Sequence, residues 1–241
     1  MAVDFDGIND HVTMGDVLDF ERTDPFSIVF WMRSTQATDG AIVSKEQSAG
    51  NFGGYIVWIS TAQSGKIEFA LVADAAGPPR LVVYETTSST NDGAWHHVVY
   101  TYSGSSLASG VALYVDGASR SLTIAVDTLS SGSTLTAIAL NLGIRNLTNL
   151  PWDGDLEDVR IFNRVLTAEE AAALGAGYRG PLGGEVGWWS CGDFAGVAHP
   201  DGTTLTTSNI MSDLSSNGND GVPTNSPVAR ASEAPRMGTW I

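Results

Sequence analysis

The chain has 241 residues, of which 43% are hydrophobic and 9% aromatic, enough for one large β domain with its own core. Its 27 acidic and 12 basic residues give a formal net charge of −15. Such a surface repels nucleic acid and anionic lipid, and no apolar run is long enough to span a bilayer. Nucleic-acid binding and membrane insertion are therefore excluded as functions.

The cysteine content and the first residues bear on the compartment. Cys191 is the only cysteine, so no internal disulfide forms, and "WWSCGD" predicts a small buried thiol. The start, "MAVDFDGINDHV", has neither the basic region nor the long apolar core of a signal peptide. The sequence predicts synthesis in a cytosol, with any later exposure by another route such as lysis.

Short alternating runs, separated by Gly, Asn, Asp and Ser, predict β-strands along most of the chain. The runs begin "FSIVFWMRS" (26–34), "GYIVWIS" (54–60), "KIEFALVAD" (66–74) and "RLVVYETT" (80–87), and continue with "WHHVVYTY" (95–102), "VALYVDG" (111–117), "ALNLGIR" (139–145) and "LEDVRIF" (156–162). Residues 64–66 and 115–119 have the composition of hairpin turns, with glycine at positive φ.

One segment predicts a helix. In "LTAEEAAALGAGY", Thr167 and Glu170 have the spacing of a capping box, and the alanines favour a helix that Gly175 and Gly177 end. Many short strands with one helix near 167–176 predict an all-β fold, an antiparallel two-sheet sandwich.

Two adjacent histidines, His96 and His97, are the most chemically suggestive pair in the chain. They lie within a strand, where successive side chains point to opposite faces of the sheet. They therefore cannot bind one ion together or act as one acid–base pair. We expect one histidine to be packed and the other to lie near the sheet surface.

The segment "DGAWHHVVYTYSGSSLASGVALYVDG" (92–117) resembles the central signature of LamG-like, concanavalin A-like lectin/glucanase jelly-roll domains of the pentraxin-like superfamily. Three further segments resemble motifs of the same family: "VDFDGINDHVTMG" (3–15), "WDGDLEDVRIFNRVLTAEEAAAL" (152–174), and "GWWSCGD" followed by "MSDLSSNGNDGVPTNSP" (187–227). The resemblance implies a concanavalin A-like jelly-roll sandwich over nearly the whole chain.

The order of these motifs departs from the family, in which the last segment normally precedes the first. We therefore expect one domain over 1–241, with 185–227 supplying closing strands beside the N-terminal strand and 228–241 forming an extended tail or arm. Two alternatives are an incomplete second repeat and an arm that reaches a neighbouring protomer of a homo-oligomer. The tail could equally cover an edge of its own domain.

Catalysis is not expected. Asp153, Asp155 and Glu157 share one parity in "DGDLEDVR", but they lack the E-x-D-x-(x)-E order of glucanases with this fold. They overlap a strand that is non-catalytic in the family, so they are expected to be solvent-facing carboxylates. No nucleophile elbow, P-loop or HExxH motif is present.

A calcium site is predicted at "DLSSNGNDG", where Asp213, Ser215, Asn217 and Asn219 alternate as in the first half of an EF-hand loop. The resemblance adds Asp158 as the carboxylate that completes a structural Ca²⁺ site. The alternative is an Asx-rich turn closed by its own hydrogen bonds.

Two functions remain. The first is a non-catalytic virion surface component, a phage head-decoration, fibre or adhesion subunit made in the host cytoplasm, with capsid or tail proteins as partners. The second is an extracellular, calcium-dependent carbohydrate-binding module of a secreted enzyme or adhesin, with glycans as ligands. The aromatic residues available for a sugar platform are Tyr55, Trp58, Trp152, Trp188, Trp189 and Trp240.

Overall fold

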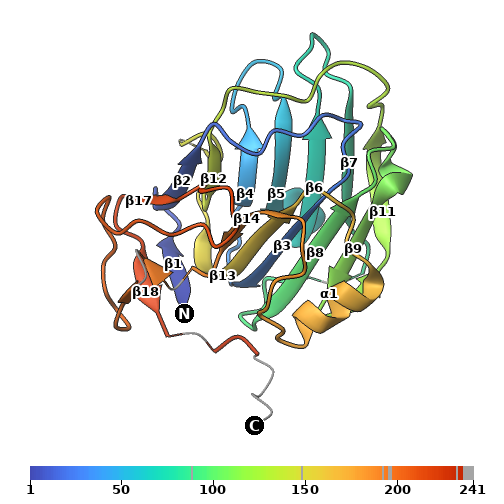
Figure 1. Ribbon diagram of the computed structural model, residues 1–241. Coiled ribbons are helices and arrows are strands. Elements are labelled where there is room, and N and C mark those ends of the chain that lie inside the picture. Colours follow the sequence, from blue (N-terminus) through green and yellow to red (C-terminus); the bar gives the residue numbers. More distant parts are fainter. Residues whose placement is uncertain (88, 148, 192, 195–196, 232, 236–241) are drawn as a thin grey trace.

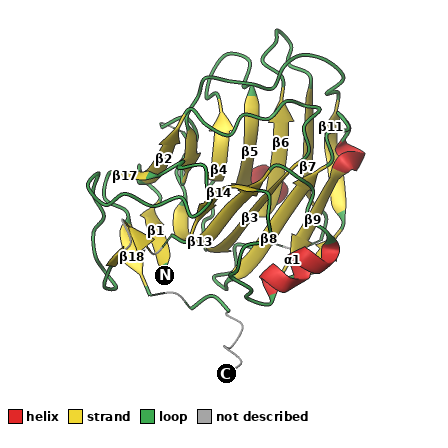
Figure 2. Ribbon diagram, in the orientation of Figure 1, coloured by secondary structure: helices red, strands yellow, loops and turns green. Residues whose placement is uncertain are grey.

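Two antiparallel β-sheets pack face to face in the computed structural model, which describes all residues except 88, 148, 192, 195–196, 232 and 236–241 (Figure 1, Figure 2). Each sheet has eight strands within this part of the chain, and α1 (Ala168–Gly175) is the α-helix there. The fold is the all-β, two-sheet jelly-roll sandwich expected from the sequence.

The strands divide between two sheets, which we call sheet A and sheet B. Sheet A runs β10 (Ala118–Arg120), β9 (Val111–Val115), β8 (His96–Tyr102), β3 (Phe26–Arg33), β13 (Asp153–Phe162), β1 (Ala2–Asp6) and β18 (Val228–Arg230), with β14 (Glu185–Trp189) also paired to β13. Sheet B runs β11 (Leu122–Asp127), β7 (Arg80–Glu85), β6 (Lys66–Val72), β5 (Gly54–Ser60), β4 (Gly40–Glu46), β12 (Leu140–Leu142), β2 (His11–Gly15) and β17 (Val222–Thr224). The small elements are the pair β15 (Asp193–Phe194) and β16 (Val197–Ala198), and the 3₁₀ turns η1 (Thr61–Gln63) and η2 (Ala108–Gly110).

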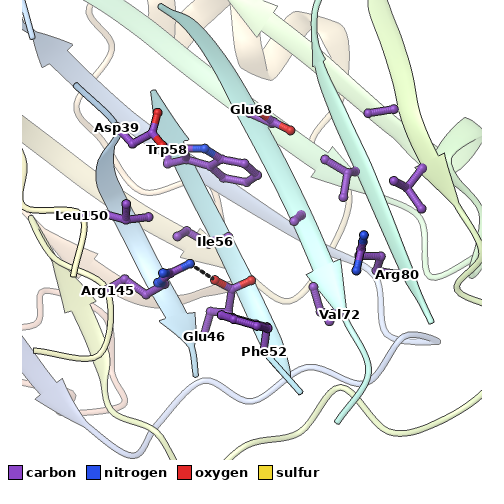
Figure 3. Close-up of a pocket in the computed structure, with 14 residues that line it drawn as sticks. Asp39, Glu46, Phe52, Ile56, Trp58, Glu68, Val72, Arg80, Arg145 and Leu150 are labelled. Atoms are coloured by element: carbon purple, nitrogen blue, oxygen red, sulfur yellow. Dashed lines mark hydrogen bonds and ion pairs between the residues drawn. The ribbon is translucent and has the colours of Figure 1, made fainter. Parts of the chain in front are cut away.

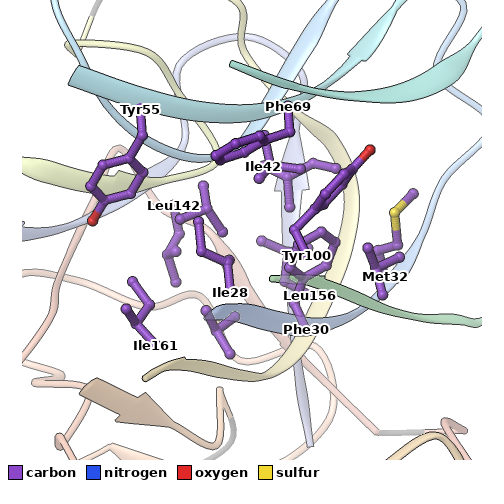
Figure 4. Packing of buried hydrophobic residues seen from close by; sticks show 14 of the residues in the cluster. Ile28, Phe30, Met32, Ile42, Tyr55, Phe69, Tyr100, Leu142, Leu156 and Ile161 are labelled. Carbon is purple, nitrogen blue, oxygen red and sulfur yellow. The ribbon is translucent and has the colours of Figure 1, made fainter. Parts of the chain in front are cut away.

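The core lies between the two sheets and follows the alternation of each strand. On β3, Ile28, Phe30 and Met32 belong to the core, and Phe69 on β6 and Tyr100 on β8 meet in a stacked contact with ring centroids 5.5 Å apart (Figure 4). Period-two patterning in both sheets therefore builds one continuous apolar interior.

The outer face of sheet A is covered as well. Val29 and Val99 alternate with core residues, yet they are fully buried because Leu174 of α1 packs with them. The helix starts as predicted: Thr167 and Glu170 form the capping box, each bonding the other's backbone N–H.

The C-terminal quarter of the described chain adds strands to both sheets. On sheet A, β18 pairs with β1 and β14 pairs with β13; on sheet B, β17 pairs with β2. Trp189, Leu205 and Met211 from this quarter are fully buried in the core. The last strands thus lie beside the first ones (Figure 1).

The expected thiol and turns are also present. Cys191 is fully buried, and burial raises the pKa of its thiol to about 12. Positive φ occurs at Ser64 and Gly65 and at Asp116 and Gly117, the centres of the two predicted hairpin turns. Within the described residues, no helix is long and apolar enough to cross a membrane.

A chain ending at Gly183 is expected to give no cooperatively unfolding monomer, because it lacks β14, β17 and β18 and leaves the site of Trp189 empty. Circular dichroism melting and size-exclusion chromatography check this, with a chain ending at Pro235 as the control that keeps every strand. A well-folded monomer ending at Gly183 would show that the C-terminal quarter is dispensable.

Candidate functional site

A groove crosses the outer face of sheet B, over β4, β5, β6, β7 and β11, and encloses about 470 Å³ (Figure 3). The floor is set by cross-strand register: Ile56, Ala70 and Val82 lie in one row on β5, β6 and β7. These apolar side chains line the groove and are themselves largely buried, and polar residues lie at both ends. This combination of an apolar floor with a few polar groups is typical of ligand sites.

One end of the groove, which we call the tryptophan end, carries Trp58, Glu68 and Asp39. Trp58 on β5 pairs directly with Glu68 on β6. Asp39, in the loop before β4, is fixed by accepting hydrogen bonds from the backbone N–H and the hydroxyl of Thr61, both at 2.6 Å. Figure 3 shows the half-buried indole between the two carboxylates.

The opposite end, which we call the arginine end, carries Glu46, Arg145, Phe52 and Arg80. The Arg145 Nη1 atom lies 3.3 Å from Glu46 Oε2 (Figure 3), and the guanidinium lies 5.5 Å from the centre of the Phe52 ring. Arg80, at the start of β7, is exposed and its charge also acts on Glu46. This end already contains a carboxylate with its cation.

Gly54 leaves a gap in the row that joins Glu46 on β4 to Val72 on β6. Its φ of +118° is a conformation that other residues rarely adopt, and an added Cβ would lie 1.9 Å from the Lys45 carbonyl oxygen. A side chain is therefore excluded at this position by the backbone itself.

Burial controls the ionisation of both groove glutamates. It raises the pKa of Glu68 to about 7, and the nearby Asp39 charge acts in the same direction. It raises the pKa of Glu46 to about 7 as well, against the opposing effect of Arg145. Both carboxyl groups are therefore partly protonated near neutral pH and can donate as well as accept hydrogen bonds.

The two glutamates lie toward opposite ends of the groove. Glu68 is in register with Trp58 and Glu46 with Gly54, four residues along β5 and two strands across. At the usual strand spacing this places their Cα atoms about 16 Å apart.

The aromatic residues singled out from the sequence divide by burial. Tyr55, Trp152 and Trp189 are buried in the core, and Trp188 is covered by the Arg160 guanidinium at 4.1 Å. Trp58 alone of the described ones lines the groove, and Trp240 lies outside the described residues.

Sequence reasoning did not find the polar groove residues Asp39, Glu46, Glu68, Arg80 and Arg145. The alternation in "KIEFALV" could have indicated the second face of this strand. Ile67, Phe69 and Leu71 point into the core, whereas Glu68, Ala70 and Val72 point to the opposite face of the sheet.

The concanavalin A-like lectin/glucanases superfamily, in its laminin G form, has a family model that matches residues 6–172, more than half of the chain. The chain belongs to this family. No curated protein sequence matches it.

Solved structures share the fold. A putative carbohydrate binding protein from Bacteroides ovatus is 16% identical with a TM-score of 0.60, over 98% of this chain and 61% of that one. The chain thus spans about three fifths of that protein's length. The binding domain of Paraclostridial Mosquitocidal Protein 1 is 10% identical with a TM-score of 0.50, over 73% of this chain and 47% of that one. A SAP-like pentraxin from Limulus polyphemus is 16% identical with a TM-score of 0.48, over 72% and 81%.

The predicted calcium loop is closed by its own hydrogen bonds. Asp213 Oδ1 accepts from the N–H groups of Trp188 and Ser215, both at 2.9 Å. Its Oδ2 accepts from the Ser215 hydroxyl and the Asn219 N–H. The Asn217 side-chain amide donates to Ser215 Oγ. Four donors fill the lone pairs that a cation would need.

The fifth predicted ligand, Asp158, is engaged elsewhere. Its two oxygens accept from Nε and Nη2 of Arg160, at 3.0 and 2.9 Å, and Oδ1 also accepts from the Trp188 indole. Asn219 presents its carbonyl to Trp189 Nε1. Across the described ranges, no three His, Cys, Asp or Glu side chains gather as metal ligands do. The carboxylate oxygens of Asp213 and Asp158 and the Asn219 carbonyl thus accept hydrogen bonds from the protein's own donors, and calcium binding stays a prediction of the sequence.

The adjacent histidines diverge as expected. His96 is held between Asp116 and Asp92, at 2.9 and 3.1 Å, and the hydrogen bond that its ring donates to the Asp116 carboxylate raises the pKa of His96. His97 is fully buried beside Trp31 on the outer face of sheet A. Burial lowers its pKa to about 3, so this ring is neutral at physiological pH.

The expectation of solvent-facing carboxylates on β13 is wrong for two of its three residues. Asp155 and Glu157 are buried: Arg33 lies 3.0 Å from Asp155, and Arg179 lies 3.9 Å from Glu157. Only Asp153 is exposed. Arginines and the C-terminal quarter cover this face, which periodicity along one strand does not reveal.

Replacing Asp213 by Ala should lower the free energy of unfolding by about 3 kcal/mol, because four donors, three of them backbone N–H groups, lose a charged acceptor. Urea unfolding measures this, with Glu169→Gln on the exposed face of α1 as a control that should change little. EGTA is expected to leave the melting temperature unchanged, and a clear drop would show that the loop holds calcium.

Glu68→Gln should stabilise the protein more at about pH 8 than at about pH 5. The unfolded chain loses this proton near the ordinary pKa of 4.5, whereas folded Glu68 keeps it up to about 7. The folded state thus binds more protons in this window, so the free energy of unfolding falls as pH rises through it. Thermal melts at both pH values check this, and an equal effect at both would contradict the raised pKa.

Proposed function

We propose that this chain is a non-catalytic carbohydrate-binding domain whose ligand lies in the groove on the outer face of sheet B. The observation that carries the proposal is the half-buried Trp58 beside an apolar floor, with hydrogen-bonding groups at both ends. A pyranose ring has apolar C–H faces and polar edges, and an aromatic ring with flanking carboxylates complements both.

The family and the similar solved structures support this proposal. The family model is that of a lectin/glucanase superfamily, and the structure with the highest TM-score reported above is titled a putative carbohydrate binding protein. Binding without hydrolysis is the function that the names of the family and of this neighbour favour. Binding independent of calcium agrees with the saturated Asp213 carboxylate.

A place on a virion surface, with capsid or tail proteins as partners, stays a prediction of the sequence. The tail, for which an arm on a neighbouring subunit and a cover for its own edge were the two alternatives, lies partly against its own chain: β18 pairs with β1, and Arg33 forms an ion pair with Glu233 at 2.9 Å. Residues 236–241 are outside the described part. A glycan-binding role is compatible with a particle surface, an adhesin or a secreted enzyme.

Replacing Trp58 by Ala should abolish binding to the oligosaccharides that a glycan array selects, a loss of at least about tenfold in affinity, because the stacking surface is removed. Trp58→Phe keeps an aromatic face and should retain part of the affinity. Val165→Ala, beside α1 on the other side of the sandwich, is the control. Isothermal titration calorimetry with and without EGTA measures each affinity, and undiminished binding by Trp58→Ala would place the ligand elsewhere.

A further inference from the structure

The carboxylates at the two ends of the groove differ in one respect. At the arginine end, Glu46 has Arg145 as its cation. At the tryptophan end, none of the ion pairs among the described residues includes Glu68 or Asp39. Glu68 receives a hydrogen bond from Ser60, and Asp39 has its bonds from Thr61. Two carboxylates thus share this end without a positive charge.

Burial makes this arrangement costly. The Glu68 residue is only 6% exposed, and buried carboxylates in proteins are usually paired with a cation. Lys66 is the candidate cation on the same strand, but its ammonium group donates a hydrogen bond to the Thr86 carbonyl. It also lies 5.6 Å from the centre of the Tyr84 ring. The protein itself therefore leaves the charge of Glu68 uncompensated.

We infer that the tryptophan end binds a sugar residue with a free ammonium group, a hexosamine, whose ring stacks on Trp58 and whose cation pairs with Glu68, with the charge of Asp39 acting in the same direction. This inference rests on the proposed glycan-binding function and names its substrate class. An ammonium group is attracted both by the two carboxylates and by the face of the indole. An acidic sugar is disfavoured here because it would add a third negative charge.

The inference also sets a pH dependence. The charged and titratable groups that face Glu68 are Asp39 before β4, Tyr84 on β7 and Lys66 on β6. The free protein holds a proton on Glu68 up to about pH 7. A ligand cation requires the ionised form of Glu68, so the preference for the amino sugar over a neutral sugar rises with pH from about 5.5 toward about 7, as long as the amine of the sugar stays protonated.

Three trisaccharides with the same β-1,4 backbone test the inference by calorimetry: the glucosamine trimer, its fully N-acetylated form, and cellotriose. We expect the glucosamine trimer to bind at least about tenfold more tightly than cellotriose. Glu68→Gln should remove most of this preference, because the amide keeps hydrogen bonding but carries no negative charge. Glu169→Gln, on α1 against sheet A, changes the net charge equally and should keep the preference.

The outcomes distinguish a failure of the ammonium site alone from a failure of the glycan-binding function on which it rests. Equal affinity for the three sugars, tighter binding of a galacturonate trimer, or a preference that survives Glu68→Gln overturns the ammonium site while glycan binding stands. A preference lost equally in Glu169→Gln shows only attraction to a negatively charged protein and also overturns it. No binding of any trisaccharide contradicts the groove's function and this inference together.

Discussion

The pairing of β13 is the interaction on which the rest of this structure depends. One edge of β13 pairs with β3, while the other is shared by β1, over residues 153–156, and β14, over 159–162. The change of partner occurs at a bulge where Asp158 has a φ of +50°. The carboxylate of this residue bonds Arg160 and the Trp188 indole of β14. Strands from the two ends of the chain are thereby joined to one central strand.

This joining also decides which surface remains open. Sheet A has its inner face in the core, and its outer face is covered by α1, by Arg160 and Arg179, and by the C-terminal quarter. Among the described residues, neither α1 nor a C-terminal strand lies over the outer face of sheet B at β5, β6 and β7, and the groove lies there. The helix and most of the C-terminal strands are placed at sheet A by the pairing of β13, which leaves this part of sheet B open.

Local signals in the sequence predicted much of the fold. The capping box of Thr167 and Glu170, the divergence of His96 and His97, and the sandwich itself depend on residues close together in the chain or on strand alternation. The site depended on which sheet faces are covered, so neither the burial of Glu157 nor the exposure of Trp58 could be predicted. Trp58 and Trp152 are the same residue type, and only the parts of the fold that pack around them decide that Trp152 is buried and Trp58 lines the groove.

Gly54 has a consequence for how this groove could change over time. Most binding sites are reshaped by exchanging side chains, and a single mutation to a larger residue can close them. Here the main-chain geometry of Gly54 excludes a side chain between Glu46 and Val72. A mutation of this glycine would therefore disturb folding instead of narrowing the groove. A change of ligand preference is then open to the residues at the two ends, where a substitution alters the charge of the groove rather than its depth.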